Sequence, residues 1–262
     1  MKIECKHVFK HFDTKDVLED CHFSVKQGEI LGIMGESGTG KSTLAKLLVG
    51  LEEPSQGEIL LEGKPYRSKD GARILLVFQD ALHAVNPLFS VRDILTEATQ
   101  NTVSLEEVVS ILKEVGLDES YLTKTPRQLS GGQLQRICIA RALLLKPDVI
   151  IFDEALSGLD PLIQGQLLRL LHQLKVKHQQ TYIFISHDFN LCYALCHRIL
   201  VMFDGKIVDE ITDFSDPIEV NHPATQNLLT KSQNPKHPKC RIRKMMASIQ
   251  QTPEGATNEK NI

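Results

Sequence analysis

Short apolar runs recur along the chain, and polar or turn-forming residues bound each of them. Four runs are continuous, as is typical of strands that are buried on both faces of a sheet. They span residues 29–34, 73–78, 148–152 and 181–185. Helical segments separate these runs, and this alternation predicts an α/β protein whose central sheet is mostly parallel.

Other stretches predict strands outside this central sheet. Residues 19–25 alternate between polar and apolar side chains, so the first 30 residues are expected to form an N-terminal antiparallel β subdomain. Residues 57–64 are typical of a short strand closed by Gly63. Residues 198–208 are predicted to form a hairpin.

Helical periodicity dominates residues 80–140, which are expected to form an inserted helical subdomain. Ser104 and Glu107 form a capping box there. The helix behind it presents an apolar stripe made of Leu105, Val108, Val109 and Leu112. A second helix is expected over residues 129–145, and Asp160 is the predicted N-cap of a third.

The strongest chemical motif lies in residues 35–42, which fit the pattern G-x-x-x-x-G-K-[ST] between a strand and a helix. Its glycines let backbone N–H groups turn towards an anion at the helix N-terminus. Lys41 is expected to reach the β- and γ-phosphates of a nucleotide, and the Ser42 hydroxyl to face Mg²⁺. The predicted nucleotide contacts are Gly35, Glu36, Ser37, Gly38, Thr39, Gly40, Lys41, Ser42 and Thr43.

Polar residues follow three of the four apolar runs. Gln79 follows the second run, Asp153 and Glu154 the third, and His187 comes just after the fourth. Ligands bind at the carboxyl ends of strands in α/β sheets. Two adjacent carboxylates there suit Mg²⁺ coordination and the activation of water. We therefore expect these four side chains to join the phosphate loop.

A second anion contact is predicted where the helix of residues 129–145 begins, at Leu129, Ser130, Gly131, Gly132 and Gln133. A serine followed by two glycines exposes backbone N–H groups at a helix N-terminus. The alternative is a purely structural cap. Two glycines weaken a helix by ~1 kcal/mol each, which favours the phosphate contact.

Composition limits the remaining choices. Of 262 residues, 42% are hydrophobic, and the formal net charge of −3 argues against a general nucleic-acid binder. The six cysteines are scattered, as in a reduced intracellular protein. No apolar run approaches the ~18 residues that cross a bilayer, so any membrane part is expected from another chain.

Two features leave alternatives open. The Phe12 ring could stack on a base, and a core position in an edge strand is equally consistent with its surroundings. Residues 231–262 begin with a basic stretch and continue as a polar one, which predicts a disordered tail after an ordered domain of residues 1–230. Contact of this tail with anionic lipids is the alternative.

In their order and spacing these motifs resemble those of the ATP-binding cassette (ABC) ATPases. The resemblance covers residues 1–230. The matching segments are Walker A at 35–42, the Q-loop at Gln79, the LSGGQ signature at 129–133, Walker B at 149–153 with the catalytic glutamate at Glu154, the D-loop at 157–160 including Asp160, the switch histidine at His187 and the A-loop aromatic at Phe12.

The resemblance implies an ABC-type P-loop NTPase that hydrolyses ATP. Ser42, Gln79 and Asp153 would then hold Mg²⁺. Glu154 would polarise the attacking water, and His187 would contact the γ-phosphate. Two such subunits sandwich two ATP molecules, so that the signature of one subunit completes the site of the other.

Finer features resemble one subfamily, the ATPases of nickel, dipeptide and oligopeptide importers. Residues 78–87 and 128–136 carry this resemblance, and residues 47–52 favour the nickel branch. Residues 222–229 resemble a run near the end of the peptide branch, with Ala224 in place of an aromatic residue. Only Cys240 lies beyond that run, so no iron–sulfur cluster is expected.

The function implied is the ATPase subunit of an importer for nickel or related transition metals, including metal–chelator complexes. Its implied partners are two transmembrane permease subunits, a second ATPase subunit (a paralogue or a copy of itself) and, indirectly, an extracytoplasmic substrate-binding protein. It would lie peripherally on the cytoplasmic face of the membrane and bind no nucleic acid. Still open are a dipeptide or oligopeptide importer, an exporter, an idle regulatory subunit, and a soluble ABC ATPase acting on ribosomes or DNA.

Overall fold

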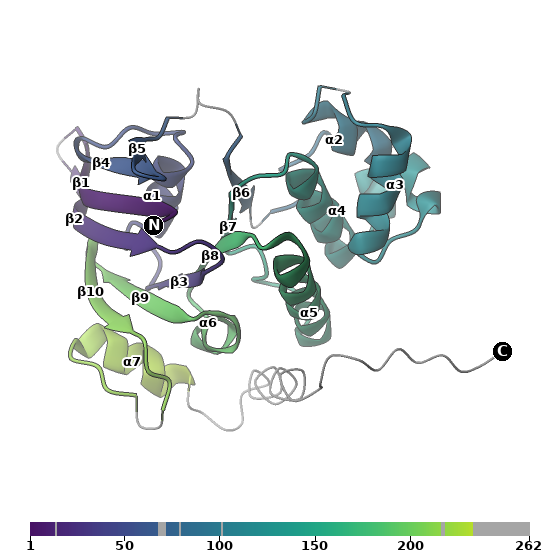
Figure 1. Cartoon of the computed structure of the whole chain (residues 1–262). Coiled ribbons are helices and arrows are strands. Elements are labelled where there is room, and N and C mark those ends of the chain that lie inside the picture. The colour runs from purple at the N-terminus through teal and green to yellow at the C-terminus, as the bar shows by residue number, and fades with distance from the viewer. Residues whose placement is uncertain (14, 68–71, 79, 101, 216–217, 233–262) are drawn as a thin grey trace.

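The computed structural model describes residues 1–13, 15–67, 72–78, 80–100, 102–215 and 218–232. Within this part, two β-sheets stand side by side and a lobe of helices extends from one of them (Figure 1). The arrangement is the predicted α/β architecture.

The N-terminal strands form an antiparallel sheet in the order β2-β1-β4-β5. Its strands are β1 (Ile3–Phe12), β2 (Lys15–Val25), β4 (Gln56–Leu61) and β5 (Lys64–Pro65). The single strand expected over residues 57–64 is divided, because the chain turns at Gly63, whose φ of 76° suits glycine.

The central sheet has the order β10-β9-β3-β8-β7-β6. Every neighbouring pair is parallel except β9 and β10, which form the predicted hairpin. Its strands are β3 (Ile30–Met34), β6 (Ile74–Phe78), β7 (Val149–Asp153), β8 (Thr181–Ser186), β9 (Arg198–Phe203) and β10 (Lys206–Ile211). The four apolar runs thus become β3, β6, β7 and β8.

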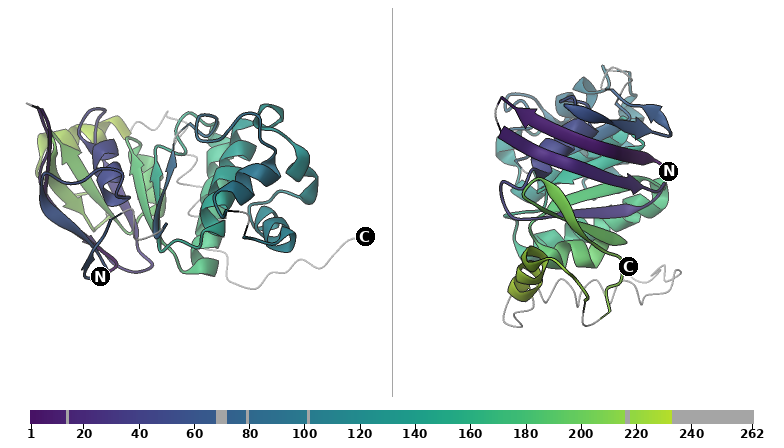
Figure 2. Two further views of the ribbon diagram at one scale, coloured as in Figure 1. Left: turned by 90° about the horizontal axis from the view of Figure 1, so that it is seen from above. Right: turned by 90° about the vertical axis from the view of Figure 1, so that its left-hand side faces the viewer.

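Both faces of the central sheet are buried, because its side chains alternate between two cores. Leu31 and Ile33 of β3 face the antiparallel sheet and α1 (Lys41–Leu48), which packs between the two sheets. Ile30 and Met34 of the same strand face the other helices. In the left view of Figure 2, α1 and the helical lobe accordingly lie on opposite sides of the central sheet.

The remaining helices cover the second face or extend from it. They are α2 (Val91–Glu97), α3 (Leu105–Glu114), α4 (Gly131–Leu144), α5 (Pro161–His178), α6 (Phe189–Leu195) and α7 (Pro223–Ser232), with 3₁₀ turns η2 (Glu119–Thr123) and η3 (Pro126–Gln128). The lobe between β6 and β7 holds α2, α3 and α4. The last helix, α7, passes residue 230 and ends at Ser232.

The apolar stripe predicted for α3 is partly wrong. Val108 and Leu112 are buried and Val109 packs against the core, but Leu105 is exposed. Ile111 takes its place in the buried face. Leu105 is the first residue of the helix, and side chains tilt towards the helix N-terminus, so it extends past the neighbours that cover the rest of the stripe.

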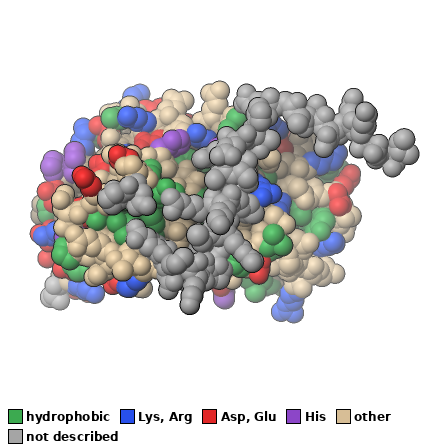
Figure 3. Space-filling view, turned by 90° about the horizontal axis from the view of Figure 1, so that it is seen from below, with side chains coloured by type: hydrophobic (Ala, Val, Ile, Leu, Met, Phe, Trp, Pro, Cys, Tyr) green, Lys and Arg blue, Asp and Glu red, His purple; other side chains and the backbone are tan. Residues whose placement is uncertain are grey.

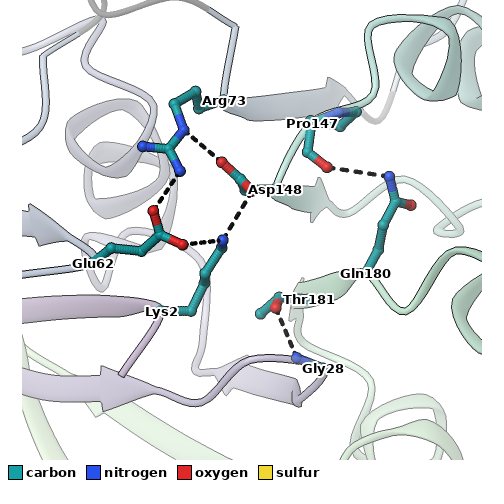
Figure 4. Close-up of polar contacts among 8 residues, drawn as sticks. All are labelled: Lys2, Gly28, Glu62, Arg73, Pro147, Asp148, Gln180 and Thr181. Carbon is teal, nitrogen blue, oxygen red and sulfur yellow. Dashed lines mark hydrogen bonds and ion pairs between the residues drawn. The ribbon is translucent and has the colours of Figure 1, made fainter.

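Four alternating charges link the amino end of β1 and the carboxyl end of β4 to the amino ends of β6 and β7 (Figure 4). Lys2 donates to Glu62 at 2.7 Å and to Asp148 at 2.8 Å. Arg73 donates to the same two carboxylates at 2.6 and 2.5 Å. Arg73 and Asp148 precede β6 and β7, so the network fixes these strands from the end opposite to the predicted site.

Among the described residues, no helix is both long and apolar enough to cross a membrane. On the face drawn in Figure 3, hydrophobic side chains are interrupted by charged and other polar groups.

Candidate nucleotide site

A cavity of about 450 Å³ opens at the carboxyl edge of the central sheet. The loop after β3 forms one side of it, and the segments after β7 and β8 form the other. Its lining residues are Val17, Ser37, Gly38, Gly40, Lys41, Ser42, Thr43, Glu154 and His187. Most of the predicted phosphate loop therefore meets the predicted catalytic glutamate and switch histidine in one place.

Close packing explains two glycines of the phosphate loop. A Cβ on Gly35 would lie 2.4 Å from the backbone oxygen of Met202 in β9. A Cβ on Gly40 would lie 2.7 Å from the backbone oxygen of Val17, and the φ of Gly40 is 98°. Neither position tolerates a side chain, so the loop can pass between β2 and β9 only with glycine there.

The N-terminus of α1 differs from those of the five helices that follow it. Serine or aspartate side chains cap α2 to α6 and accept a backbone N–H in each. The N-cap of α1 is Gly40, which provides no side-chain cap, and the first turn of α1 carries no acidic residue. Its N–H groups and positive dipole end are therefore directed at the cavity without an internal anion.

Lys41 is held inside the loop by two carbonyl oxygens. Its Nζ donates to Gly35 at 2.9 Å and to Glu36 at 2.6 Å. Burial lowers the pKa of Lys41, and the negative charges of Glu154 and Asp153 oppose that shift. The ammonium thus lies near two carboxylates that favour its charged form.

Asp153 and Ser42 offer oxygen ligands for a cation beside the phosphate loop. Burial raises the pKa of the Asp153 carboxyl, against a hydrogen bond with Ser42 that lowers it. The Oδ1 atom of Asp153 is buried and has no hydrogen-bond partner among the described residues. An orphaned carboxylate oxygen next to a hydroxyl fits a hard cation such as Mg²⁺.

Both carboxylate oxygens of Glu154 are engaged. Oε1 accepts hydrogen bonds from the His187 backbone N–H at 3.1 Å and pairs with His187 Nδ1 at 2.8 Å. Oε2 accepts a hydrogen bond from the Ser157 hydroxyl. The φ of Glu154 is 51°, an uncommon value for a residue other than glycine. The backbone therefore turns sharply at Glu154 and directs its side chain towards the cavity.

The signature segment does not line this cavity. It opens α4 on the other side of the central sheet from α1, and Ser130 caps α4 by accepting the Gln133 N–H. The Gln133 side chain accepts the Ser130 N–H through Oε1 and donates to the Tyr121 hydroxyl through Nε2. A Cβ on Gly132 would lie 2.7 Å from Ile163, whereas one on Gly131 would meet Leu159 at an ordinary 3.8 Å. Packing thus explains Gly132 but not Gly131.

Three further predicted residues have different outcomes. Gln79 lies outside the described residues. Asp160 caps α5, as expected, by accepting the Leu162 N–H at 2.8 Å. Phe12 ends β1 with 44% of its surface exposed, so it is not the core residue of the alternative interpretation. The Lys10 ammonium lies 4.6 Å from its ring centroid.

Sequence reasoning missed three contributors to the site. Val17 lines the cavity because the β9–β10 turn packs against its backbone. The resemblance placed Ser157 in the D-loop, but its bond to Glu154, three residues earlier in the chain, was not predicted. Lys231 of α7 lies 2.8 Å from Glu36 in the phosphate loop, a contact across 195 positions that no local pattern predicts.

Together the phosphate loop, the adjacent carboxylates and the separate LSGGQ helix define an ABC-type ATPase, an enzyme that binds and hydrolyses ATP. The chain belongs to the ABC transporter family, whose family model matches residues 18–157. It is 45% identical to the nickel import ATP-binding protein NikE of Escherichia coli O6:K15:H31 over 206 residues, which cover 74% of this chain and 77% of that protein. NikE of Escherichia coli K12 is 44% identical over the same length and shares of each chain.

Solved structures show the same fold. CbiO1 of Clostridium perfringens, part of the ABC transporter complex CbiONQ, superposes with a TM-score of 0.74 at 25% identity, covering 95% of this chain and 98% of that one. The ATP-binding cassette MJ0796, solved as a dimer with ADP and phosphate bound, gives 0.68 at 27% identity, covering 79% and 97%.

Proposed function

We propose that this chain is the ATPase subunit that energises a nickel importer. The observation that carries the proposal is its 45% identity to nickel import ATP-binding proteins over 74% of the chain. The site supports it, because the phosphate loop, Glu154 and His187 line one cavity. Related transition metals and their chelator complexes belong to the same proposal.

ATP hydrolysis here consists mainly of positioning and charge stabilisation. Lys41 and the loop amides hold the β- and γ-phosphates. Ser42, Asp153 and Gln79 would hold Mg²⁺, which, when bound, neutralises charge on these phosphates. Glu154 polarises a water whose oxygen bonds to the γ-phosphorus while the bond to the β,γ-bridging oxygen breaks, giving ADP and phosphate. His187, which pairs with Glu154, would contact the γ-phosphate.

The active form proposed is a head-to-tail pair of ATPase subunits. The residues at the start of α4 are not among those that line the nucleotide cavity of the same chain. A second subunit would supply the phosphates that they bind. This partner is a paralogue or a second copy of the chain, and ATP would close the pair until hydrolysis opens it.

The surface after β6 is the proposed contact with the permease subunits. Phe78, Leu82 and Leu88 are exposed there, Leu88 by 83%. The backbone between Leu82 and Leu88 is fixed to the helical lobe, since Arg141 donates to the Ala84 oxygen at 2.9 Å. Apolar side chains on a fixed segment suit a permease helix. This docking would place the chain peripherally at the cytoplasmic face of the membrane, with the substrate-binding protein reached only through the permease.

The test combines partner capture with uptake. A tagged Glu154→Gln chain, expected to hold ATP, is purified with ATP and Mg²⁺ from gently solubilised membranes, and its partners are identified by mass spectrometry. Permease subunits and a second ATPase are expected, and loss of the gene should abolish uptake of labelled nickel. Capture of ribosomal or DNA-repair proteins without a permease would overturn the transport function.

A dipeptide or oligopeptide importer is the second candidate. The resemblance of residues 222–229 to the peptide branch favours it, and most of this run forms α7. Normal nickel uptake together with lost dipeptide uptake in the deleted strain would establish this candidate instead.

A further inference from the structure

The short turn after β7 links the carboxylate of Glu154 to the segment that precedes α5. Ser157 stands three residues after Glu154, and its hydroxyl donates to Glu154 Oε2. Its backbone N–H also donates to the Glu154 carbonyl at 2.8 Å. The two residues are therefore connected through both the backbone and the side chains.

The hydrophobic core and α5 hold this turn in place. Ala155 and Leu156, between the two bonded residues, are buried in the core. The side chain of Gln164, itself buried in α5, donates to the Leu156 carbonyl at 2.8 Å. Because the backbone on which Ser157 stands is fixed, the direction of its hydroxyl is fixed as well.

The hydrogen bonds to Glu154 leave little freedom. A carboxylate has about two lone pairs on each oxygen. Two contacts from His187 fill Oε1, and Ser157 takes one position on Oε2. Counting the described residues, one lone pair of Oε2 remains available for water.

We infer that Ser157 is a positioning residue for ATP hydrolysis: its hydroxyl holds Oε2 of Glu154 so that the remaining lone pair faces the attacking water. The inference rests on the proposed role of Glu154. It adds to that role a residue that touches neither phosphate nor water, because Ser157 does not line the nucleotide cavity. The chemistry remains with Glu154, and Ser157 sets its orientation.

The test begins with Ser157→Ala and single-turnover hydrolysis of pre-bound ATP by the whole chain. We expect the rate to fall about tenfold, the typical loss of one hydrogen bond to a charged group. ATP affinity and the thermal unfolding midpoint should stay at the parent values. Ser157→Thr keeps a hydroxyl and should restore most of the rate. Ser110→Ala, an exposed serine in α3, is the matched control.

A double-mutant cycle decides whether Ser157 acts through Glu154. Adding Ser157→Ala to Glu154→Gln should change the residual rate by less than about twofold, because the group that Ser157 orients is already lost. An equal tenfold loss in both backgrounds would overturn the inference. So would a parent rate for Ser157→Ala, or a fall in its unfolding midpoint that accounts for the loss. A parent rate for Glu154→Gln would instead overturn the role of Glu154 and the inference with it.

Discussion

Lys41 carries a buried charge that its own loop satisfies before any phosphate arrives. Its ammonium bonds to two carbonyl oxygens of that loop. Lys41→Ala should therefore lose most nucleotide affinity, at least about tenfold, since bonds to charged groups are the stronger ones. Titration calorimetry with ATP measures this. Lys46→Ala, which removes an exposed lysine from the same helix, should bind as the parent does. Equal affinities for both variants would refute the phosphate-cradle interpretation.

Variants of the two signature glycines, Gly131 and Gly132, can distinguish an effect on packing from an effect on phosphate binding. Gly132→Ala should lower stability by about 1–3 kcal/mol, because its Cβ would collide with Ile163. Gly131→Ala has room and should leave stability unchanged or raise it by up to about 1 kcal/mol. It should nevertheless slow ATP turnover, since a methyl group would stand at the expected approach of the partner's phosphate. Urea unfolding and a phosphate-release assay measure the two effects.

Two outcomes would count against this separation. If Gly132→Ala lowers stability as much in an Ile163→Ala background as it does in the parent, the collision is not its cause. If Gly131→Ala turns over ATP at the parent rate, the signature glycine has no role in phosphate binding and only the structural cap remains.

At the scale of the elements, the charge network of Figure 4 holds β6 and β7 in place at their amino ends. Hydrogen bonds from Arg73 and then Lys2 lower the pKa of Glu62 to about 2. A carboxyl whose pKa is lowered in the folded state adds stability above its ordinary pKa of about 4.3 and loses it as the pH falls towards the folded value.

Glu62→Gln should therefore be less stable than the parent at neutral pH, and the difference should shrink between about pH 4.3 and pH 2. Urea midpoints measured across this range test the sign. Glu97→Gln, in which an exposed glutamate of α2 is changed, should show no such convergence. A difference that stays constant down to pH 2 would mean that Glu62 contributes no charge to the network.

The elements that follow local rules were predictable from the sequence. Ser104 caps α3, Asp160 caps α5, and four apolar runs form the parallel strands, because capping and burial patterns act over a few residues. The phosphate loop, Glu154 and His187 could be located at the ends of strands, because each directly follows one of these apolar runs or the strand that it forms. The prediction that Leu105 belongs to the buried stripe was wrong, since its exposure depends on where neighbouring helices end.

Contacts between distant segments were not predictable. Val17 reaches the cavity because the phosphate loop and the β9–β10 turn both pack against its backbone, and no periodicity in β2 encodes these contacts. The ion pair of Lys2 with Asp148 likewise depends on how the two sheets stand together. The sequence of one chain records neither register between sheets nor the packing of a turn on a remote strand.

At the scale of the whole molecule, the site is divided between two places. The cavity holds the phosphate loop and Glu154, while the start of α4 lies across the central sheet. No rearrangement within a compact chain would bring the two together without opening a buried core. A second subunit in head-to-tail orientation would bring them together at no such cost, and MJ0796 has been solved as a dimer with ADP and phosphate bound.

Nucleotide should therefore control the association of subunits. The Glu154→Gln chain with ATP and Mg²⁺ is expected to double its mass in light scattering. In the pair, the phosphates of each bound ATP gain a second set of N–H donors from the other subunit. Removal of ATP should return it to the monomer, and Lys41→Ala should stay monomeric throughout. A chain that binds ATP to saturation yet remains monomeric would show that it does not pair with itself. The second half of each site would then have to come from a different ATPase subunit, and mixing the two chains with ATP would restore the doubled mass.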